Sequence, residues 1–589
     1  MTPESKPDID KDVKSDDSFQ LTPSRRRLFQ WLAGLGIGST VFHRALATAA
    51  EADANITVEM IQQAEWIAGI TLADKDREAL AGSLNRQRKD YQAMRAVSLP
   101  NEIPPALSFI PAPWLPPSCE PVRRGIEPME RAAPKKPERG DDLAFLPVTA
   151  LAALLRTRQI SSVALTKLYL ERLRRYDPIL HCVISYTEEL ALKQAERADR
   201  EIAAGRYRGP LHGIPWGAKD LIAYPGYRTT WGAAPFKDQT LAVKATVARR
   251  LDEAGAVLAA KLTLGALAMG DQWFGGQTRN PWNPKRGSSG SSAGSAAATA
   301  AGLVGFALGS ETLGSIVSPS RTCGVTGLRP TFGRVSRHGC MTLSWSMDKI
   351  GPICRSVEDC ALVFAAIHGL DGLDPSAVDR PFAWPSRREL NTLRVGYIEE
   401  KGGIDQRDEV RVLRDLGLRM VPIKLPSKLP FHALRLILDT EAAAVFDDLT
   451  RKGVREGLNA WSNIFRAHQF VPAVEYLRAQ RIRTLVQREM AEVMEQVDLY
   501  VGGNDLVLTN LTGHPTVVLP NGFRRVGGRE QPTALTFTGR LYGETELLAV
   551  AHAYQRATGH HLNRPPMEED KGESRTSTQP ATTPQIPNG

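Results

Sequence analysis

Three short segments of this chain carry hydroxyl or amine side chains within glycine-containing turns. The first, residues 213–221, reads GIPWGAKDL and carries Lys219. The second, residues 287–295, reads GSSGSSAGS, and the third, residues 309–319, reads GSETLGSIVSP. Glycine and serine at this density permit tight turns, close approach of backbone N–H groups and several hydroxyls in one place. Such groups support nucleophilic attack by a serine hydroxyl.

A serine hydroxyl needs a base, and none of the three segments contains a histidine. Lysine can be that base only when it is neutral, yet at its reference pKa of about 10.4 only about one lysine in a thousand is neutral at pH 7. The apolar neighbours Ile214 and Trp216 predict that burial depresses the pKa of Lys219. The alternative is an exposed surface pair between Lys219 and Asp220.

The glycine-serine loop at 287–295 has three other readings. A flexible linker is disfavoured because the loop runs into an alanine-rich helical segment and an apolar run at 303–308. A phosphate-binding loop is disfavoured because Gly-Lys-Ser/Thr is missing and we expect no strand before the loop. The nucleophile elbow G-x-S-x-G, with Ser292 as its serine, fits residues 290–294, but Pro281 and Pro284 argue against the central strand that it needs.

Taken together, the three segments resemble the amidase-signature family, whose members carry a GIPxxxKD segment, a GGSSGGSA loop and a GSDTGGSI turn in this order. The resemblance runs from roughly Leu143 to Pro566 and includes the later runs TGLRPTFGRVS at 326–336 and TNLTGHP at 509–515. It implies a hydrolase that acts on a carboxamide bond without a cofactor or metal. It also implies the site residues: Lys219 as base, Ser291 as the proton-relaying serine on a cis peptide, Ser315 as nucleophile, and the backbone N–H groups of Thr312, Leu313, Gly314 and Ser315 as oxyanion hole.

Two residues of the third segment depart from the family pattern. Leu313 stands where relatives usually have glycine, and Val317 stands where they usually have arginine. The leucine side chain is expected to wall the acyl part of the pocket. The missing arginine leads us to expect that Glu311 has lost its partner. A binding protein that keeps the fold without catalysis is therefore one alternative, and an amidotransferase subunit is another.

The elements that must position these segments alternate between helical and β-branched or apolar runs. Helices are expected at 150–175 and 188–204, and strands at 256–262, 303–308 and 516–519. This alternation predicts an α/β fold, and the family resemblance implies a mixed central sheet with helices on both faces. Helical insertions such as 406–490 are expected to decorate the sheet.

The ends of the chain predict an export signal, a helical extension and a disordered tail. Arg25 and Arg26 precede a short apolar run and an A-x-A site at 45–47, which is typical of twin-arginine export to the periplasm. The predicted organisation is: 1–47 leader and signal, 48–97 helical extension, 98–141 proline-rich linker, 142–566 catalytic domain, and 567–589 disordered tail.

Charge, apolar run length and cysteine spacing indicate which binding partners this chain is expected to have. The formal charge is +9, but the basic residues are scattered among acidic ones, so nucleic-acid binding is not expected. The apolar run of the signal is too short to span a bilayer, so no stable membrane insertion is expected after cleavage. The six cysteines show no metal-like spacing, and whether any two form a disulfide is left open. The expected partner is a small-molecule amide, while a homodimer is neither predicted nor excluded.

Overall fold

A computed structural model describes residues 55–99, 106–107, 125–126, 134–398, 407–503 and 505–567 of the chain. The predicted signal lies outside these residues, as does the predicted tail apart from Met567, and the predicted linker lies mostly outside them. The chain divides into two compact units, Met1–Asn85 and Arg86–Gly589. The domain boundaries predicted from the sequence stay predictions.

The first unit consists of helical segments in its described part. Helix α3 (Val58–Ala68) is capped by the Thr57 hydroxyl, which accepts from the Met60 N–H, and α4 (Asp74–Arg95) begins in this unit. The buried Glu65 accepts a hydrogen bond from Arg77 at 2.6 Å. Both helices lie within the helical extension predicted at 48–97.

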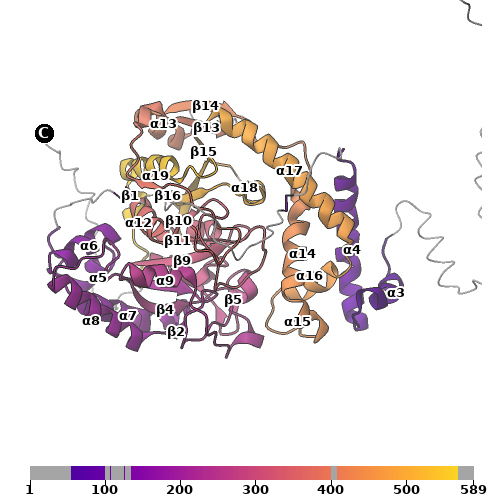
Figure 1. Ribbon diagram of the computed structural model, residues 1–589, viewed down its shortest axis with the longest axis horizontal. Coiled ribbons are helices and arrows are strands. Elements are labelled where there is room, and N and C mark those ends of the chain that lie inside the picture. Colours follow the sequence, from indigo (N-terminus) through magenta and orange to yellow (C-terminus); the bar gives the residue numbers. More distant parts are fainter. Residues whose placement is uncertain are drawn as a thin grey trace, which may run out of the picture. The chain divides into compact units, whose positions relative to one another are not determined.

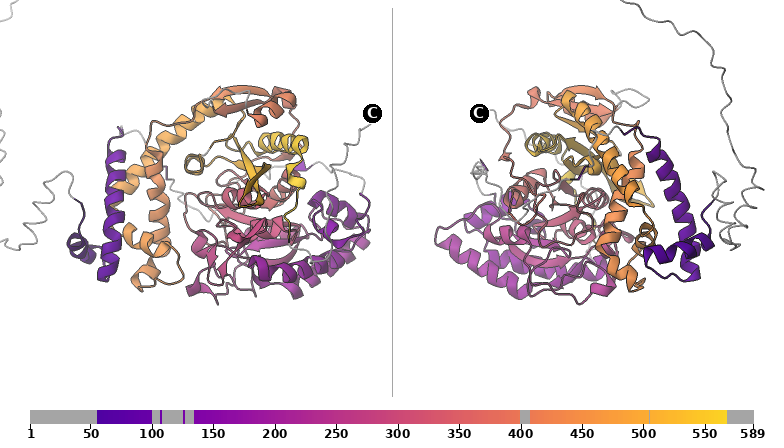
Figure 2. Two further views of the ribbon diagram at one scale, coloured as in Figure 1. Left: turned by 180° about the vertical axis from the view of Figure 1, so that it is seen from behind. Right: turned by 45° about the vertical axis from the view of Figure 1, so that its right-hand side comes forward.

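The second unit is built on an eleven-stranded mixed sheet (Figures 1 and 2). The strand order is β14-β13-β15-β17-β16-β10-β11-β9-β3-β4-β2. The strand bounds are β2 Val183–Tyr186, β3 Pro215–Lys219, β4 Val257–Leu262, β9 Phe306–Glu311, β10 Thr326–Arg329, β11 Lys349–Cys354, β13 Arg394–Ile398, β14 Arg419–Ile423, β15 Leu499–Val501, β16 Thr516–Val526 and β17 Arg529–Gly539. Strand β3 pairs in parallel with both β4 and β9, whereas β9 and β11 are antiparallel.

Helices flank this sheet, and apolar cores lie against both of its faces. In β9, Phe306 and Leu308 belong to one core and Ala307 belongs to the other, as the two-residue period of a strand requires. Figure 1 shows α7 and α8 beside the β2 end of the sheet. The helices of the unit are α5 Gly140–Ala144, α6 Val148–Arg156, α7 Ser162–Leu180, α8 Glu188–Ala203, α9 Thr246–Glu253, α10 Ala293–Ala300, α11 Val317–Cys323, α12 Val357–Ile367, α13 Asp408–Asp415, α14 Arg435–Val445, α15 Asp447–Arg451, α16 Trp461–His468, α17 Ala473–Gln496, α18 Leu506–Thr512 and α19 Glu544–Thr558.

Several elements differ from the sequence prediction. The helix predicted at 150–175 is two helices, α6 and α7, and Ser161 caps the second by accepting from the Ala164 N–H. The strand predicted at 303–308 begins at Phe306 and continues to Glu311. The insertion at 406–490 is not wholly helical, because it contains the edge strand β14.

A strand also precedes the glycine-serine loop, which corrects the prediction of none. Strand β8 (Asn283–Gly287) pairs with β7 (Arg279–Asn280) in a two-stranded ribbon that is separate from the large sheet. Pro284 is accommodated there because a two-stranded ribbon leaves one edge of each strand without a backbone partner. The loop is therefore not the central strand-turn-helix elbow that an α/β-hydrolase requires.

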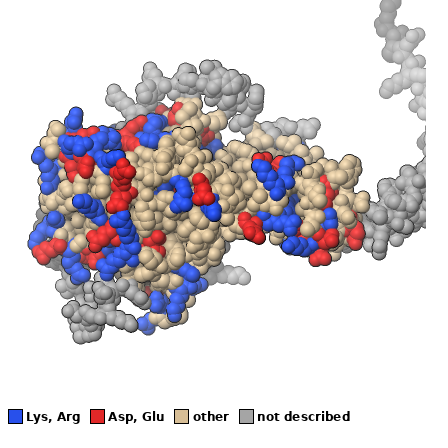
Figure 3. Space-filling model, turned by 90° about the horizontal axis from the view of Figure 1, so that it is seen from below, with Lys and Arg blue, Asp and Glu red and all other residues tan. Residues whose placement is uncertain are grey.

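On the face in Figure 3, lysine and arginine are interspersed with aspartate and glutamate rather than gathered in one field. No described helix is both long enough and apolar enough to cross a bilayer. Five cysteines are free thiols: Cys182, Cys323, Cys340, Cys354 and Cys360. The sixth, Cys119, lies outside the described residues.

Candidate active site

The three chemistry-bearing segments converge at the carboxyl ends of β3 and β9. The two strands are parallel neighbours, with Ala218 in register with Leu308, so both chains leave the sheet at the same edge. Lys219 ends β3, and the turn that carries Ser315 follows β9. The glycine-serine loop reaches the same place, where the Ser292 N–H donates to the Ser315 carbonyl at 3.1 Å.

Lys219 is completely buried and is surrounded by serine oxygens. Its Nζ lies 2.8 Å from the Ser291 hydroxyl, 3.0 Å from that of Ser292 and 2.9 Å from that of Ser310. Among the described residues no carboxylate pairs with it, and Asp220 instead pairs with Lys261. The predicted alternative of an exposed Lys219–Asp220 surface pair is therefore wrong.

Burial holds the pKa of Lys219 well below its usual value, and the carboxylates of Asp348 and Glu311 offset this only in part. Desolvation disfavours the charged ammonium form of the lysine. Hydroxyl groups offset this desolvation penalty less than a carboxylate would. A lysine in this setting can accept a proton from a serine hydroxyl. Ser291 lies nearest to the nitrogen, and its peptide bond to Gly290 is cis.

The turn after β9 presents the Ser315 hydroxyl together with unused backbone donors. Gly314 has a φ of +88°, a conformation that glycine adopts without strain. Within the described part of the chain, no hydrogen bond uses the N–H groups of residues 312–315 or the hydroxyl of Ser315. Unpaired donors at a turn of this kind suit a developing oxyanion.

The buried carboxylate of Glu311 holds this turn in place through hydrogen bonds. One oxygen of its carboxylate accepts from the N–H groups of Ile316 at 2.8 Å and Val317 at 2.9 Å. The other accepts from Arg329 at 2.7 Å and from the Asn510 amide at 2.8 Å. Burial alone would raise the pKa of Glu311, but Arg329 and its other partners lower it to about 2.

The expectation that Glu311 lacks a partner is therefore wrong. Arg329 comes from β10, 12 positions beyond Val317, and it also donates to the His514 carbonyl. Both Arg329 and Asn510 lie in runs that carry the family resemblance, although neither was predicted as a site residue. Their roles were hidden because the contacts join residues separated by 18 and 199 positions.

A cavity of about 180 Å³ opens onto the Ser315 turn. Leu313 lines it, as the steric argument predicted, whereas Ser292 is buried outside it and bonded to Lys219 and Ser310. The lining is mostly apolar: Ala268, Met269, Gly270, Gly290, Thr312, Leu313, Ser315, Leu343, Arg435, Leu438 and Trp461.

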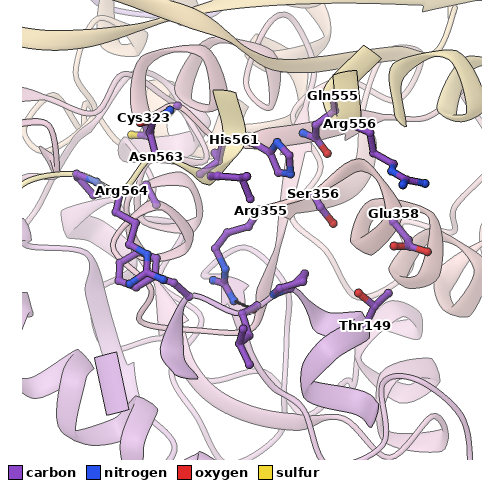
Figure 4. A pocket seen from close by; sticks show the side chains of 18 of the residues that line it. Thr149, Cys323, Arg355, Ser356, Glu358, Gln555, Arg556, His561, Asn563 and Arg564 are labelled. Atoms are coloured by element: carbon purple, nitrogen blue, oxygen red, sulfur yellow. Dashed lines mark hydrogen bonds between the residues drawn. The ribbon is translucent and has the colours of Figure 1, made fainter. Parts of the chain in front are cut away.

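A larger cavity of about 600 Å³ lies elsewhere in the second unit (Figure 4). Arg355 and His561 are among its lining residues, but Lys219, Ser291 and Ser315 are not. The Arg355 guanidinium is held by the carbonyls of Val304 and Leu146, each at 2.8 Å. Because the lysine and the two serines of the three segments all lie elsewhere, this larger cavity is not the candidate active site.

Comparisons with known proteins agree with one another. Residues 164–502 match the family described as Amidase. The A subunit of glutamyl-tRNA(Gln) amidotransferase from Moorella thermoacetica is 33% identical over 489 residues, covering 72% of this chain and 99% of that protein. The protein of the same name from Chloroflexus aurantiacus is 35% identical over 485 residues, with 72% and 99% covered. Peptide amidase from Stenotrophomonas maltophilia has a similar structure, with a TM-score of 0.62, 30% identity, and coverage of 71% of this chain and 98% of that one.

Proposed function

The chain belongs to the amidase family, and from this premise we propose that it hydrolyses a carboxamide through an acyl-enzyme on Ser315. The observation that carries the proposal is that the fully buried Lys219 bonds serine hydroxyls and one serine carbonyl, with no carboxylate partner among the described residues. That lysine lies beside the turn at 312–315, whose backbone N–H groups form no hydrogen bond with the residues that the structure describes. Base, relay and oxyanion donors are thus available at one edge of the sheet.

The proposed reaction has two halves. In the first, Ser315 Oγ attacks the amide carbon while its proton passes to Ser291, and the Ser291 proton passes to Lys219. The backbone N–H groups of residues 312–315 bind the oxyanion. The carbon–nitrogen bond then breaks, and the leaving amine takes a proton back along the same path. In the second half, water attacks the ester and releases the acid, which restores Ser315.

An amide-library screen of the purified protein tests this function. Wild-type protein is expected to release ammonia or an amine from at least one class of amide, and Ser315→Ala to release none. Arg451→Gln is a suitable control, because this half-exposed arginine on α15 pairs with Asp447 and does not line the cavity. Equal release by wild type and Ser315→Ala would contradict the proposal.

An amidotransferase-type subunit is the second candidate, since the two amidotransferase proteins named above share at least 33% of aligned residues with this chain. The two candidates use the same chemistry up to the acyl-enzyme and differ in the fate of the released ammonia. A hydrolase turns over as an isolated chain and releases ammonia to water. An amidotransferase component would instead depend on partner proteins that carry the ammonia to an acceptor. Turnover that appears only when such partners are added would favour this second candidate.

We also propose that the chain is exported to the periplasm by the twin-arginine route. The pattern of Arg25 and Arg26, a short apolar run and the A-x-A site supports this. Replacing both arginines with lysine should leave the precursor in the cytoplasm, whereas Arg44→Lys should not. Normal periplasmic yield of the double variant would contradict the proposal.

A further inference from the structure

One wall of the Ser315 cavity comes from the helical insertion, where α14 contributes Arg435 and Leu438 and α16 contributes Trp461. These two helices pack together (Figure 1). Of the described residues that line the cavity, Arg435 alone carries a charge. A single cation in a mostly apolar lining indicates how a ligand is oriented, because such pockets orient their ligands with few polar groups.

The Arg435 guanidinium is held by one edge only. Its Nε donates to Asp439, one helical turn later, at 3.2 Å. Its side chain is 54% exposed, whereas that of Asp439 is 11% exposed. Within the described part of the chain, the two terminal nitrogens have no hydrogen-bond partner. The open edge is the part of a guanidinium that binds a carboxylate through two parallel hydrogen bonds.

The charged groups around Arg435 favour a ligand with a single negative charge. Asp439 is its only acidic neighbour with a close contact in the described residues, and His468 lies 4.0 Å from the same carboxylate. Burial lowers the pKa of His468, so it adds little positive charge at neutral pH. The site therefore offers a single open guanidinium edge above apolar walls that include Leu313 and Leu343.

We propose that the substrate is a short aliphatic amide whose far end carries a carboxylate, and that this carboxylate binds the terminal nitrogens of Arg435. The inference rests on the proposed function, since the amide must reach Ser315 at the same time. A cavity of about 180 Å³ is small for a ligand site, so the substrate must be short. Monoamides of four- to six-carbon dicarboxylic acids are short amides of this kind, and the half-exposed guanidinium of Arg435 lets their carboxylate lie at the open side of the cavity.

The test compares an anionic and a neutral amide of similar length in the full chain. The kcat/KM values for glutaric acid monoamide and for pentanamide are measured in wild type, Arg435→Gln, Arg435→Lys and the control Arg451→Gln. Arg435→Gln should lower the anionic-to-neutral ratio by about 10- to 100-fold, chiefly through KM for the anion, as loss of a charged hydrogen-bonded pair predicts. Arg435→Lys should recover only part of the ratio, because lysine lacks the two-pronged geometry. Arg451→Gln should keep the ratio. An unchanged ratio in Arg435→Gln would overturn the inference.

A binding measurement separates failure of this inference from failure of the proposed function. Glutarate, which has no amide to cleave, is titrated calorimetrically into wild type and Arg435→Gln. Binding to wild type that is lost in Arg435→Gln supports the carboxylate site even if no amide is hydrolysed. Equal binding to both proteins, or no binding to wild type, would overturn it.

Discussion

Two fully buried lysines lie on neighbouring strands of the same sheet and differ in what surrounds their side-chain nitrogen. Among the described residues, Lys219 at the end of β3 bonds only hydroxyl and carbonyl oxygens of serines. Lys261, on β4, donates to the Asp220 carboxylate at 2.6 Å, to the Arg228 carbonyl at 2.9 Å and to the Thr229 hydroxyl at 3.1 Å. Both side chains are 0% exposed.

The comparison teaches that burial alone does not make a lysine a base. Removal from water disfavours an ammonium group everywhere, but a carboxylate at hydrogen-bond distance offsets the penalty. The ion pair of Lys261 suits it to hold the loop after β3, where Asp220 also accepts from Thr230. The hydroxyl ligands of Lys219 suit it to exchange a proton with a serine.

The largest expected effect comes from Lys219→Met. Because no carboxylate loses its partner, the variant should fold with a free energy of unfolding close to that of wild type. Its amide hydrolysis should fall by about 10²- to 10⁴-fold, the usual contribution of a general base. Turnover and urea denaturation of one preparation check both points. Near-normal turnover would break the distinction between the two lysines.

The matched change, Lys261→Met, should act on stability instead. It leaves the Asp220 carboxylate buried without its cation, which costs about 3–5 kcal/mol of unfolding free energy. Adding Asp220→Asn should recover part of this loss. Chemical denaturation measures it, and a Lys261→Met protein as stable as Lys219→Met would contradict the assignment of a structural role.

The buried carboxylate of Glu311 is paired with a cation, as Asp220 is, and its contribution to stability should depend on pH. Its folded-state pKa of about 2 lies below the ordinary value of 4.5, so its contribution is fully present above pH 4.5. That contribution, about 3 kcal/mol by linkage, is lost as the pH falls from 4.5 toward 2. Glu311→Gln should show a shallower acid loss over this window in denaturation curves. Equal slopes for the two proteins would show that Arg329 does not stabilise the carboxylate.

The smallest effect is expected from Ser310→Ala, which removes one hydroxyl from the surroundings of Lys219. One neutral hydrogen bond contributes about 1 kcal/mol, so kcat should change by less than about 10-fold. Ser295→Ala is a matched control, because this buried serine of α10 bonds the Leu308 carbonyl rather than the lysine. A loss as large as that of Lys219→Met would mean that Ser310 relays the proton.

Local sequence was sufficient to find Lys219 and the two serine turns, because their residue types and order are specific. The alternation of helical and apolar runs was sufficient to predict an α/β fold, whereas the mixed sheet with helices on both faces was implied by the family resemblance. Leu313 was predictable as a pocket residue because its side chain emerges within the donor turn.

Contacts between distant segments were not predictable in this way. Arg329 pairs with Glu311 although Val317 is not an arginine, and the pairing of β10 with β11, and of β11 with β9, brings Arg329 near Glu311. The partner of Asp220 is likewise Lys261 on the next strand rather than the adjacent Lys219. Arg435 reaches the cavity from an insertion whose periodicity shows only that it is helical.

The most direct test of the account is to locate the residue that a serine-directed fluorophosphonate labels, and to follow the labelling rate with pH. The account predicts one adduct, on Ser315, absent in Ser315→Ala and much slower in Lys219→Met. The rate should fall as the pH drops through the lowered pKa of Lys219, because only the neutral amine accepts the proton. An adduct on Ser292, or a rate that is the same in Lys219→Met as in wild type, would contradict it.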